Sequence, residues 1–358
     1  MNMPMPQTDT AAAQSLDAGA KVSRNRAHAL PTPAELKKQL PLPALLDSRV
    51  ATQRRHIADV IQGRDSRLLV IVGPCSIHDE DAALDYGERL ATLAAELDDR
   101  LLVVMRAYLE KPRTTVGWKG LLYDPQRDGS AALEQGLVRS RRLLMRLADL
   151  GLPLATEALN PLAFSYLDDL LAWTAIGART TESQPHRELA SGLDMAVGFK
   201  NGTDGGVEVA INAMQAAARP HHGLGIDAEG RVAMCSTEGN PDTHVVLRGG
   251  RNLTNYDVDS IGAAQEILRG AGLNPRVIVD CSHDNACKQP ERQPGIAHEV
   301  LAQRLAGNQA IAGVMLESFL EDGRQAAEEP LQYGVSITDP CIGWARTEAL
   351  LRELHDRL

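Results

Sequence analysis

The feature of this sequence that most limits its fold is a regular alternation of short apolar runs with longer amphipathic stretches. Short runs rich in β-branched residues predict strands, and stretches with apolar residues at i, i+3 and i+4 spacing predict helices. The predicted strands are 68–75, 101–106, 154–157, 175–179, 196–200, 245–248, 277–283 and 311–317. Repeated strand–helix units build a parallel sheet covered by helices, and eight of them favour a closed α/β barrel over an open doubly wound sheet.

The helices expected between these strands include 81–97, 133–150, 208–218, 258–272 and 296–306. Hydrophobic residues make up 44% of the chain, but aromatic residues only 3%. Burial must therefore come from Leu, Ile, Val and Ala, which suits a parallel sheet wrapped in helices and disfavours an all-β sandwich.

Two parts of the chain depart from the strand–helix alternation. Residues 1–32 are expected to form a disordered tail, and residues 33–66 a helical extension interrupted by Pro41 and Pro43, ahead of a barrel at 67–358. At about 221–237, two strand-like runs joined by Ala228-Glu229-Gly230 predict a β-hairpin inserted outside the barrel.

Charge and cysteine content limit the partners and the compartment. A formal net charge of −10 argues against a nucleic-acid or anionic-membrane partner. Five cysteines form an odd count without framework spacing, which indicates reduced thiols in a cytoplasmic protein. No apolar run reaches ~18 residues and the first residues lack a secretory signal, so neither a membrane span nor export is expected.

Each predicted strand ends in an ionisable residue or a metal-ligand type. These residues are Cys75, Arg106, Glu157, Arg179, Lys200, Arg248, His283 and Glu317. Barrel enzymes carry their active sites at the C-terminal ends of the strands. The sequence therefore predicts one site at this end of the barrel.

Four basic residues, Arg106, Arg179, Lys200 and Arg248, would meet there and repel one another unless anions lay between them. Guanidinium groups match phosphate and carboxylate oxygens, so a small phosphorylated carboxylate is the predicted ligand. Any one of these residues alone would as readily form a surface ion pair. The argument depends on the four sharing one rim.

Cys75, His283 and Glu317 end the first, seventh and eighth strands, which become neighbours when a barrel closes. With Asp339 from the following loop they offer thiolate, imidazole and carboxylate groups. This set suits one divalent ion of Mn, Fe, Co or Zn and is poor for Mg or Ca. Taken singly, Cys75 could equally be a small buried apolar residue, and His283 a core histidine with satisfied hydrogen bonds.

Two loops carry further anion-binding groups. The segment 111–120 starts at Lys111 and contains two further cations, two hydroxyl residues and glycines. It is expected either to bind a second phosphate or to be a solvated basic loop. The segment 177–183 joins a strand end to a helix start, where free N–H groups favour anions.

Six segments together resemble a known family. They are Gly73-Pro74-Cys75-Ser76-Ile77-His78, Lys111-Pro112-Arg113-Thr114-Thr115, Gly177-Ala178-Arg179-Thr180-Thr181-Glu182-Ser183, Gly198-Phe199-Lys200-Asn201-Gly202-Thr203, Leu247-Arg248-Gly249-Gly250 and Ser336-Ile337-Thr338-Asp339. Their order and content are similar to those of the class I 3-deoxy-D-arabino-heptulosonate 7-phosphate (DAHP) synthases of enteric bacteria and yeast, over about residues 33–355.

The resemblance implies a (β/α)8 TIM barrel that condenses phosphoenolpyruvate with erythrose 4-phosphate and water, giving DAHP and phosphate at the start of the shikimate pathway. It implies a metal site of Cys75, His283, Glu317 and Asp339. It implies a phosphoenolpyruvate site of Arg106, Lys111, Glu157, Arg179, Lys200, Arg248 and the Ala178 backbone, and an erythrose 4-phosphate site of Arg113, Thr114 and Thr115. Lys111 would then protonate the aldehyde oxygen, and Glu157 would orient the water.

The chain also departs from the family pattern. Asp284 follows the metal histidine where the family usually has a small residue, Ala158-Leu159-Asn160 replaces the common Phe-Leu-Asp, and Phe164-Ser165 stands where the phenylalanine-regulated form has Pro-Gln. Gly225 stands where that form tends to carry Ser, which would leave room for a tyrosine hydroxyl. We therefore expect tyrosine as the aromatic effector, with phenylalanine, tryptophan and chorismate as alternatives, and a homo-oligomer, dimer or tetramer, formed through the extension and the hairpin.

Three other functions compete with this prediction. One is the sibling condensation of phosphoenolpyruvate with arabinose 5-phosphate, as in 3-deoxy-D-manno-octulosonate 8-phosphate synthases, which the segment 111–115 disfavours. Another is an aldolase that uses Lys200 as a Schiff-base nucleophile. The third is a non-catalytic homologue that only binds the effector, which would require the loss of a ligand or cage residue.

Overall fold

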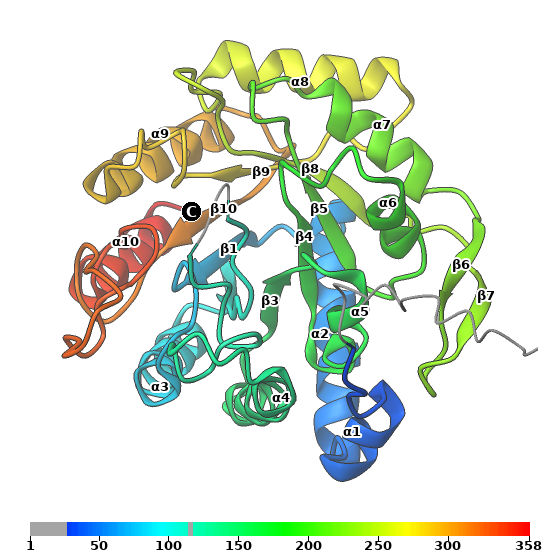
Figure 1. The fold of residues 1–358 in the computed structure, drawn as a ribbon. Helices are drawn as coiled ribbons and strands as arrows, with labels where there is room; N and C mark the ends of the chain where they lie inside the picture. The colour runs from blue at the N-terminus through cyan, green and yellow to red at the C-terminus, as the bar shows by residue number, and fades with distance from the viewer. Residues whose placement is uncertain (1–26, 114–116) are drawn as a thin grey trace, which may run out of the picture. The chain divides into compact units, whose positions relative to one another are not determined.

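Eight parallel strands close into a barrel in a computed structural model that describes residues 27–113 and 117–358 (Figure 1). The strands are hydrogen-bonded in the order β1-β10-β9-β8-β5-β4-β3-β2. They are β1 Leu68–Gly73, β2 Leu101–Arg106, β3 Leu154–Glu157, β4 Trp173–Ile176, β5 Ala196–Lys200, β8 Thr243–Leu247, β9 Val277–Asp280 and β10 Ile311–Glu317. The predicted (β/α)8 barrel is confirmed.

Helices surround the barrel and connect successive strands (Figure 1). They are α1 Pro33–Gln39, α2 Ala44–Gln62, α3 Glu80–Glu96, α4 Leu133–Asp149, α5 Pro161–Phe164, α6 Gln184–Ser191, α7 Glu208–Ala217, α8 Val258–Gly270, α9 Gln293–Leu305 and α10 Trp344–Arg357. Two 3-10 turns, η1 Asp168–Leu170 and η2 Pro290–Arg292, complete the set. The expected tail, residues 1–32, lies almost wholly outside the described residues, and the domain boundaries at 32 and 66 stay predictions.

Four strands end earlier than their apolar runs suggested. β2, β3, β5 and β10 end at the predicted residues, whereas Cys75, Arg179, Arg248 and His283 lie in the loops that follow β1, β4, β8 and β9. The β4 loop shows the reason, because Thr180 and Thr181 donate their N–H groups back to the Gly177 carbonyl and form a tight turn. These residues still lie at the C-terminal end of the barrel.

Both faces of the barrel strands are buried. Along β1, Leu68, Val70 and Val72 belong to the cluster between strands and helices, while Leu69 and Ile71 belong to the cluster inside the barrel. Side chains alternate between the two faces of a strand, so both faces of such a barrel strand are buried and most positions are apolar, with buried polar exceptions such as Thr174 and His244. This is why the strands appear in the sequence as mostly apolar runs.

The helix α2 closes the N-terminal end of the barrel. Its Ile57, Val60 and Ile61 are fully buried and belong to the same cluster as the residues inside the barrel. Arg54 Nε donates to the Leu171 carbonyl just before β4, and Gln62 Nε2 donates to the Pro241 carbonyl just before β8. The extension is therefore packed against the barrel, and it leaves the C-terminal end for ligands.

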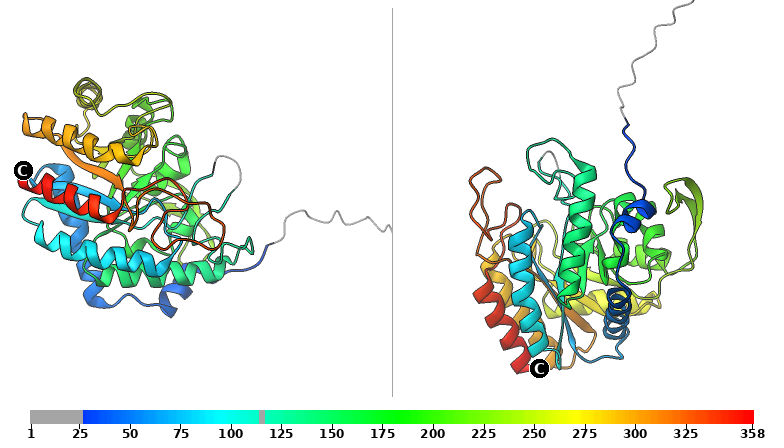
Figure 2. Two further views of the ribbon diagram at one scale, coloured as in Figure 1. Left: turned by 90° about the vertical axis from the view of Figure 1, so that its left-hand side faces the viewer. Right: turned by 90° about the horizontal axis from the view of Figure 1, so that it is seen from below.

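Two long loops rise together at that C-terminal end. The β2–α4 loop and the β10–α10 loop lie on the same side of the molecule, and the C-terminus of α10 lies on the other (Figure 2). An ion pair between Arg127 and Glu329 joins the two loops. The loops thus form part of the wall of the barrel mouth.

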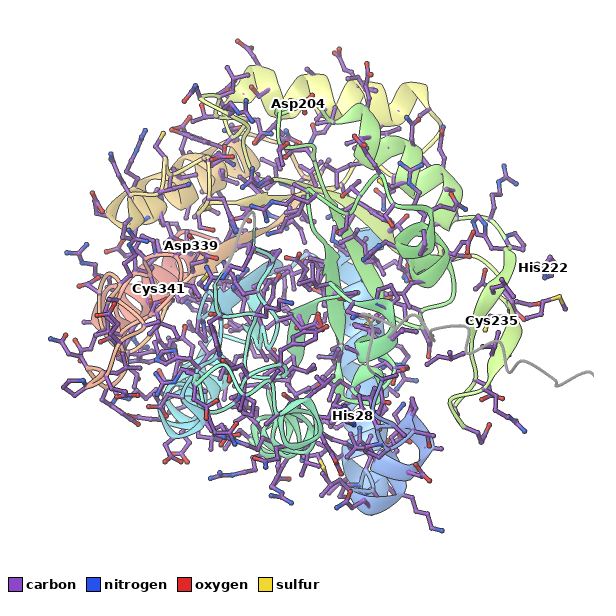
Figure 3. The ribbon with its side chains drawn as sticks, viewed as in Figure 1. His28, Asp204, His222, Cys235, Asp339 and Cys341 are labelled. Carbon is purple, nitrogen blue, oxygen red and sulfur yellow. The ribbon has the colours of Figure 1, made fainter. Side chains whose placement is uncertain are left out.

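The predicted hairpin is confirmed as an antiparallel pair, β6 His222–Ile226 and β7 Val232–Ser236, inserted between α7 and β8 (Figures 1 and 3). One face exposes Leu224, Val232 and Met234, with exposed fractions of 88%, 80% and 77%. The other face carries Gly223 and Gly225.

Among the residues that the structure describes, no helix is both long and apolar enough to cross a bilayer. The cytoplasmic location stays a prediction.

A buried arginine on α4 ties the extension to the barrel and supplies a test of the packing. The guanidinium of Arg141 donates to both carboxylate oxygens of Asp169 at 2.7 Å and to the carbonyls of Leu40 and Tyr166. We expect Arg141→Met to lower the free energy of unfolding by roughly 2–4 kcal/mol, because Asp169 and two carbonyls lose their donor. Denaturant unfolding of the full chain measures the change.

The matched control is Arg142→Met, one residue along α4, where the side chain is exposed. It should change the free energy of unfolding by less than about 0.5 kcal/mol. Equal destabilisation by the two substitutions would contradict the assignment of this role to Arg141.

Candidate functional site

A cavity of about 250 Å³ opens at the C-terminal end of the barrel and collects most of the predicted site residues. Its lining includes Arg106, Lys111, Arg113, Glu157, Ala178, Arg179, Lys200, Arg248, His283, Glu317 and Asp339. Thr114 and Thr115 lie outside the described residues. Residues from seven strand ends and their loops thus meet at this cavity, and their individual roles stay predictions.

A larger cavity of about 740 Å³ lies beside the mouth, between the β5–α7 loop and α8. Its carboxylates are Glu182, Asp204 and Glu208, and the described residues that line it include no lysine or arginine. Figure 3 shows Asp204 of this cavity well apart from Asp339 of the smaller one. Because volume alone gives no chemistry, we take the smaller, mixed-charge cavity as the site.

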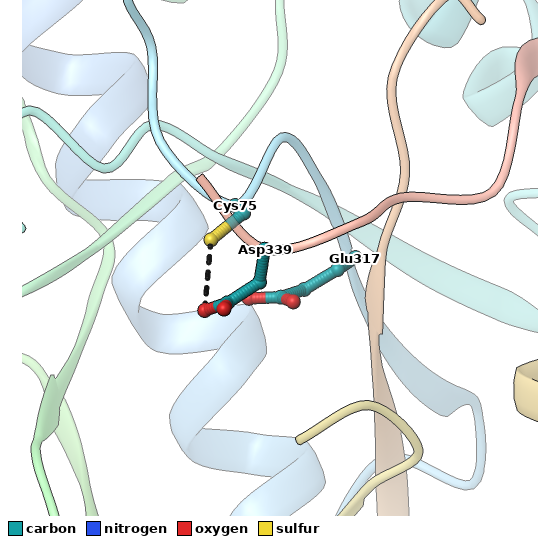
Figure 4. Close-up of side chains that lie close together, drawn as sticks. All are labelled: Cys75, Glu317 and Asp339. Carbon is teal, nitrogen blue, oxygen red and sulfur yellow. Dashed lines mark hydrogen bonds between the residues drawn. The ribbon is translucent and has the colours of Figure 1, made fainter. Parts of the chain in front are cut away.

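Three candidate metal ligands lie together at its edge. Ligand atoms of Cys75, Glu317 and Asp339 are all within 4.8 Å of one another (Figure 4). Cys75 Sγ lies 3.5 Å from Asp339 Oδ2, and Cys75 is fully buried. Closure of the barrel explains the cluster, because β10 pairs directly with β1.

A cationic side chain reaches this cluster. Lys111 Nζ donates to Cys75 Sγ at 2.8 Å and to Asp339 Oδ2 at 2.7 Å. Burial acts to raise the pKa of Asp339, but the charge and hydrogen bond of Lys111 outweigh it and hold that pKa well below its usual range. Burial, reinforced by Glu317, raises the pKa of Cys75 to about 12. The cluster thus attracts positive charge, and its thiol and carboxylate donors fit a divalent transition metal.

His283 stands at the border of the cluster. Its Nε2 lies 3.7 Å from Glu317 Oε1, while Nδ1 lies 2.8 Å from Asp280 Oδ2 and 2.7 Å from Ser282 Oγ. A carboxylate on one ring nitrogen commonly orients a histidine whose other nitrogen binds a metal. His283 as the fourth ligand stays a prediction, and this arrangement supports it.

Arg106 is the most deeply buried cation of the cavity. Its side chain is 1% exposed, its Nη2 donates to Glu317 Oε1 at 3.2 Å, and its guanidinium carbon lies 4.0 Å from the centre of the Tyr108 ring. A guanidinium at this depth needs both a counter-charge and a polarisable surface. Glu317 and Tyr108 supply them.

The other cations also have acidic partners where the structure gives one. Lys200 Nζ lies 3.2 Å from Asp280 Oδ2, and Arg248 Nη1 lies 2.5 Å from Asp284 Oδ2. Arg179 lines the cavity from an exposed position in the turn after β4, and Arg113 Nε donates to the Trp118 carbonyl at 2.8 Å. The cavity is therefore a set of alternating charges and not a cluster of bare cations.

The Glu157 carboxylate lies close to the Gly177 backbone in the loop that follows β4. A Cβ atom built on Gly177 would lie 2.3 Å from Glu157 Oε1, closer than any real contact. Only glycine at position 177 lets the Glu157 carboxylate occupy this place beside the Ala178 backbone in the cavity wall.

The sequence interpretation missed two residues of the site, Asp280 and Tyr108. Asp280 is fully buried and pairs with both Lys200 and His283. The predicted strand 277–283 extends to His283, so Asp280 falls inside it and not at its end. The available signal is the same as for Glu157 and Glu317, because Asp280 is the carboxylate that follows the apolar run 277–279. Tyr108 follows β2 in a loop, where no periodicity indicates which way a side chain faces.

Comparisons with known proteins agree with this geometry. The model of the DAHP synthetase I family matches residues 36–352. A "Phospho-2-dehydro-3-deoxyheptonate aldolase, Tyr-sensitive" from Escherichia coli K12 is 54% identical over 332 residues, which are 92% of this chain and 93% of that protein. A Phe-sensitive enzyme of that name from the same organism is 50% identical, with 89% and 94% covered.

A solved structure gives the same result. The phospho-2-dehydro-3-deoxyheptonate aldolase of Francisella tularensis SCHU S4 superposes with a TM-score of 0.91 at 40% sequence identity, covering 93% of this chain and 97% of that one.

The buried carboxyl of Glu110 supplies a prediction on pH. Burial, with the nearby charge of Glu157, raises the pKa of Glu110 to about 8 from an ordinary value of 4.5. The folded state therefore keeps a proton that the unfolded state loses, so this contribution to stability is complete below pH 4.5 and is lost as the pH rises through about 8. Relative to Glu110→Gln, the wild type should lose roughly 2–4 kcal/mol of unfolding free energy between about pH 5 and pH 9.

Denaturant unfolding of both proteins at the two pH values measures this difference. Glu134→Gln, at an exposed position on α4, serves as the control and should follow the wild type. Parallel pH dependence of the wild type and Glu110→Gln would contradict the proton on Glu110.

Proposed function

Because the chain belongs to the DAHP synthetase I family and is a transferase, we propose that it condenses phosphoenolpyruvate with D-erythrose 4-phosphate and water. The products are DAHP and inorganic phosphate, and the reaction opens the shikimate pathway. The observation that carries this proposal is a single cavity that joins a cage of cations to a thiol–carboxylate cluster. A phosphorylated carboxylate and a polarised carbonyl need these two environments side by side.

The cations bind and orient phosphoenolpyruvate. Arg106, Lys200 and Arg248 come from three different strand ends, so together they contact an anion from several directions. Arginine forks hold carboxylate and phosphate oxygens in fixed planes. Arg179 and the Ala178 backbone extend this cage, and substrate anions would take over part of the charge neutralisation that the acidic partners now provide.

The acceptor sugar phosphate lies further out. Arg113 lines the outer wall of the cavity from the β2–α4 loop, and we assign it to the phosphate of erythrose 4-phosphate together with Thr114 and Thr115. Holding that phosphate there directs the aldehyde inward, toward the metal ligands. Positioning of this kind converts a two-substrate encounter into a reaction between fixed neighbours.

Cys75, His283, Glu317 and Asp339 would hold one divalent ion of Mn, Fe, Co or Zn. Three of their donor groups lie together, and the contacts of the Lys111 ammonium with Cys75 and Asp339 support a place for positive charge. When bound, the ion supplies Lewis acidity at the aldehyde carbonyl.

The remaining chemistry is proton transfer and water positioning. As C3 of phosphoenolpyruvate bonds to the aldehyde carbon, the aldehyde oxygen takes a proton from Lys111 Nζ, which lies among the metal ligands. Glu157 orients the water that adds to C2 and accepts one of its protons. The resulting hemiketal phosphate breaks its C2–O bond, which leaves the ketone of DAHP and releases inorganic phosphate.

Release of inorganic phosphate from the two substrates tests the reaction. We expect turnover with erythrose 4-phosphate, much weaker turnover with arabinose 5-phosphate, loss of activity after chelation, and recovery on addition of Mn²⁺. Cys75→Ala should lower kcat by at least about 100-fold because a metal ligand is lost. Cys287→Ala, which changes an exposed thiol in the β9–α9 loop, is the control and should retain activity.

Circular dichroism of Cys75→Ala separates loss of a ligand from loss of the fold. A folded Cys75→Ala protein with wild-type turnover, or full activity in chelator, would contradict the metal site. Borohydride trapping of the substrate on Lys200 would instead indicate the Schiff-base route.

We propose tyrosine as the feedback inhibitor. The Tyr-sensitive relative is 54% identical to this chain and the Phe-sensitive one 50%. Gly225 faces Ala233 across the hairpin, and a Cβ atom at Gly225 would lie 2.7 Å from Cys235 Sγ. A Cβ atom at Gly223 would lie 2.8 Å from Glu188 Oε2 of α6, so the glycine face of the hairpin is turned toward the body of the protein. A side chain at position 225 would therefore need Cys235 to move, and we propose that its absence leaves room for the tyrosine hydroxyl.

Steady-state rates with each aromatic amino acid and chorismate test the effector. Tyrosine should inhibit most strongly, and Gly225→Ser should weaken its inhibition by roughly tenfold, because the added side chain displaces Cys235. Ala228→Ser adds the same hydroxyl at the exposed hairpin turn and should leave inhibition unchanged. Stronger inhibition by phenylalanine, or no effect of tyrosine at millimolar concentration, would refute the assignment.

Assembly into a dimer or tetramer is part of the same proposal. The outer face of the hairpin exposes Leu224, Val232 and Met234 together on paired strands. An exposed apolar strip of this kind is typical of a contact surface.

A further inference from the structure

We propose that Asp284 is a positioning residue that holds Arg248 for phosphoenolpyruvate and thereby sets the affinity for this substrate. The inference rests on the proposed function of Arg248 as part of the phosphoenolpyruvate cage. Its starting observation is the ion pair between Arg248 Nη1 and Asp284 Oδ2, at 2.5 Å. The two side chains are 13% and 26% exposed, so the pair lies partly within the wall of the mouth.

Arg248 is held at both its backbone and its side chain. Its N–H donates to Asn201 Oδ1 at 2.8 Å, and its carbonyl accepts from the Asn285 N–H at 3.3 Å. Asp284 and Asn285 are consecutive, so one short segment of the β9–α9 loop fixes both the backbone and the guanidinium of Arg248. Among the residues that the structure describes, Asp284 is the hydrogen-bond partner of the Arg248 guanidinium.

The segment that carries Asp284 is itself anchored. Asn285 Nδ2 donates to the carbonyls of Leu247 and Asp280, at the ends of β8 and β9, and Asn285 Oδ1 accepts from the Asn255 N–H. His283, just before Asp284, has a φ of 50°, a backbone conformation that non-glycine residues adopt only when their surroundings fix it. The carboxylate of Asp284 is therefore presented from a defined place.

The position of Asp284 favours orientation of Arg248 over competition with the substrate. Arg248 borders two cavities, the inner one of about 250 Å³ and an adjoining one of about 560 Å³. Asp284 lines the adjoining cavity and does not line the inner one. Its carboxylate thus contacts Arg248 in the part of the mouth that the inner cavity does not include, although the two cavities share Arg248 and Glu317.

Two of the other cage cations are arranged differently, whereas Lys200, like Arg248, has a partner outside the set of candidate ligands, Asp280. Arg106 and Lys111 pair with Glu317 and Asp339, which line the inner cavity and are candidate metal ligands. Asp284 lies outside that set of ligands, so it is free to keep its arginine in place throughout the reaction.

Removing Asp284 would let the Arg248 side chain sample both cavities. Ordering a long side chain when the ligand binds then lowers the affinity, because the rotamer entropy is lost at that step. A neutral oxygen at the same place still accepts the hydrogen bond from Nη1. The length and shape of the side chain, more than its charge, should decide the outcome.

The test compares Asp284→Ala, Asp284→Asn and the control Glu291→Ala in the metal-loaded full chain. Asp284→Ala should raise KM and Kd for phosphoenolpyruvate about five- to tenfold, with kcat and the KM for erythrose 4-phosphate within about twofold. Asp284→Asn should stay within about threefold of the wild type, since one acceptor oxygen remains. Glu291→Ala removes a nearby exposed charge on η2 and should change nothing.

A double-mutant cycle with Arg248→Ala completes the test. If Asp284 acts through Arg248, adding Asp284→Ala to Arg248→Ala should cause no further loss of phosphoenolpyruvate binding. The proposal is overturned if Asp284→Ala leaves KM unchanged or lowers it, if Asp284→Asn is as impaired as Asp284→Ala, or if the two substitutions are additive. Failure of the proposed function has a different signature, because the wild type would then release no phosphate or Arg248→Ala would bind phosphoenolpyruvate normally.

Discussion

The site depends on one electrostatic constraint: several like charges can surround a small cavity only if each has a counter-charge close by. The mouth of this barrel meets the constraint with alternating groups. Arg106 lies against Glu317, Lys111 against Asp339 and Lys200 against Asp280. Carboxylates that would ligate a metal therefore also neutralise the substrate cage. A metal ion, a substrate anion or a proton on Lys111 would each change the charge at the mouth. These paired side chains would have to balance each such change together.

The barrel provides this set because closure makes distant segments neighbours. β1 and β10 are more than 200 residues apart in the chain and pair directly, which brings Cys75 next to Glu317 and Asp339. An open sheet would leave these segments at opposite edges. The fold and the site are thus consequences of the same hydrogen-bonded ring.

The sequence predicted the barrel well because strands buried on both faces are mostly apolar runs, and their charged ends are distinct from the apolar residues before them. It predicted strand ends less well where an apolar run continued into a turn, as at Arg179 and His283. Which carboxylate pairs with which cation depends on side-chain direction in three dimensions, so the Arg248–Asp284 and Lys200–Asp280 pairs were not predictable. The same holds for the packing of α2 inside the end of the barrel, because its apolar positions fit any amphipathic surface helix.

That packing has a consequence for traffic through the enzyme. Ile57, Val60 and Ile61 pack with the side chains inside the barrel and close its N-terminal end, so the cavity opens at the C-terminal end. Substrates and products would therefore enter and leave through the same opening. Arg106 is almost fully buried and Arg113 is exposed, so under the proposed function a ligand at Arg106 would have to enter before a ligand at Arg113 and leave after it.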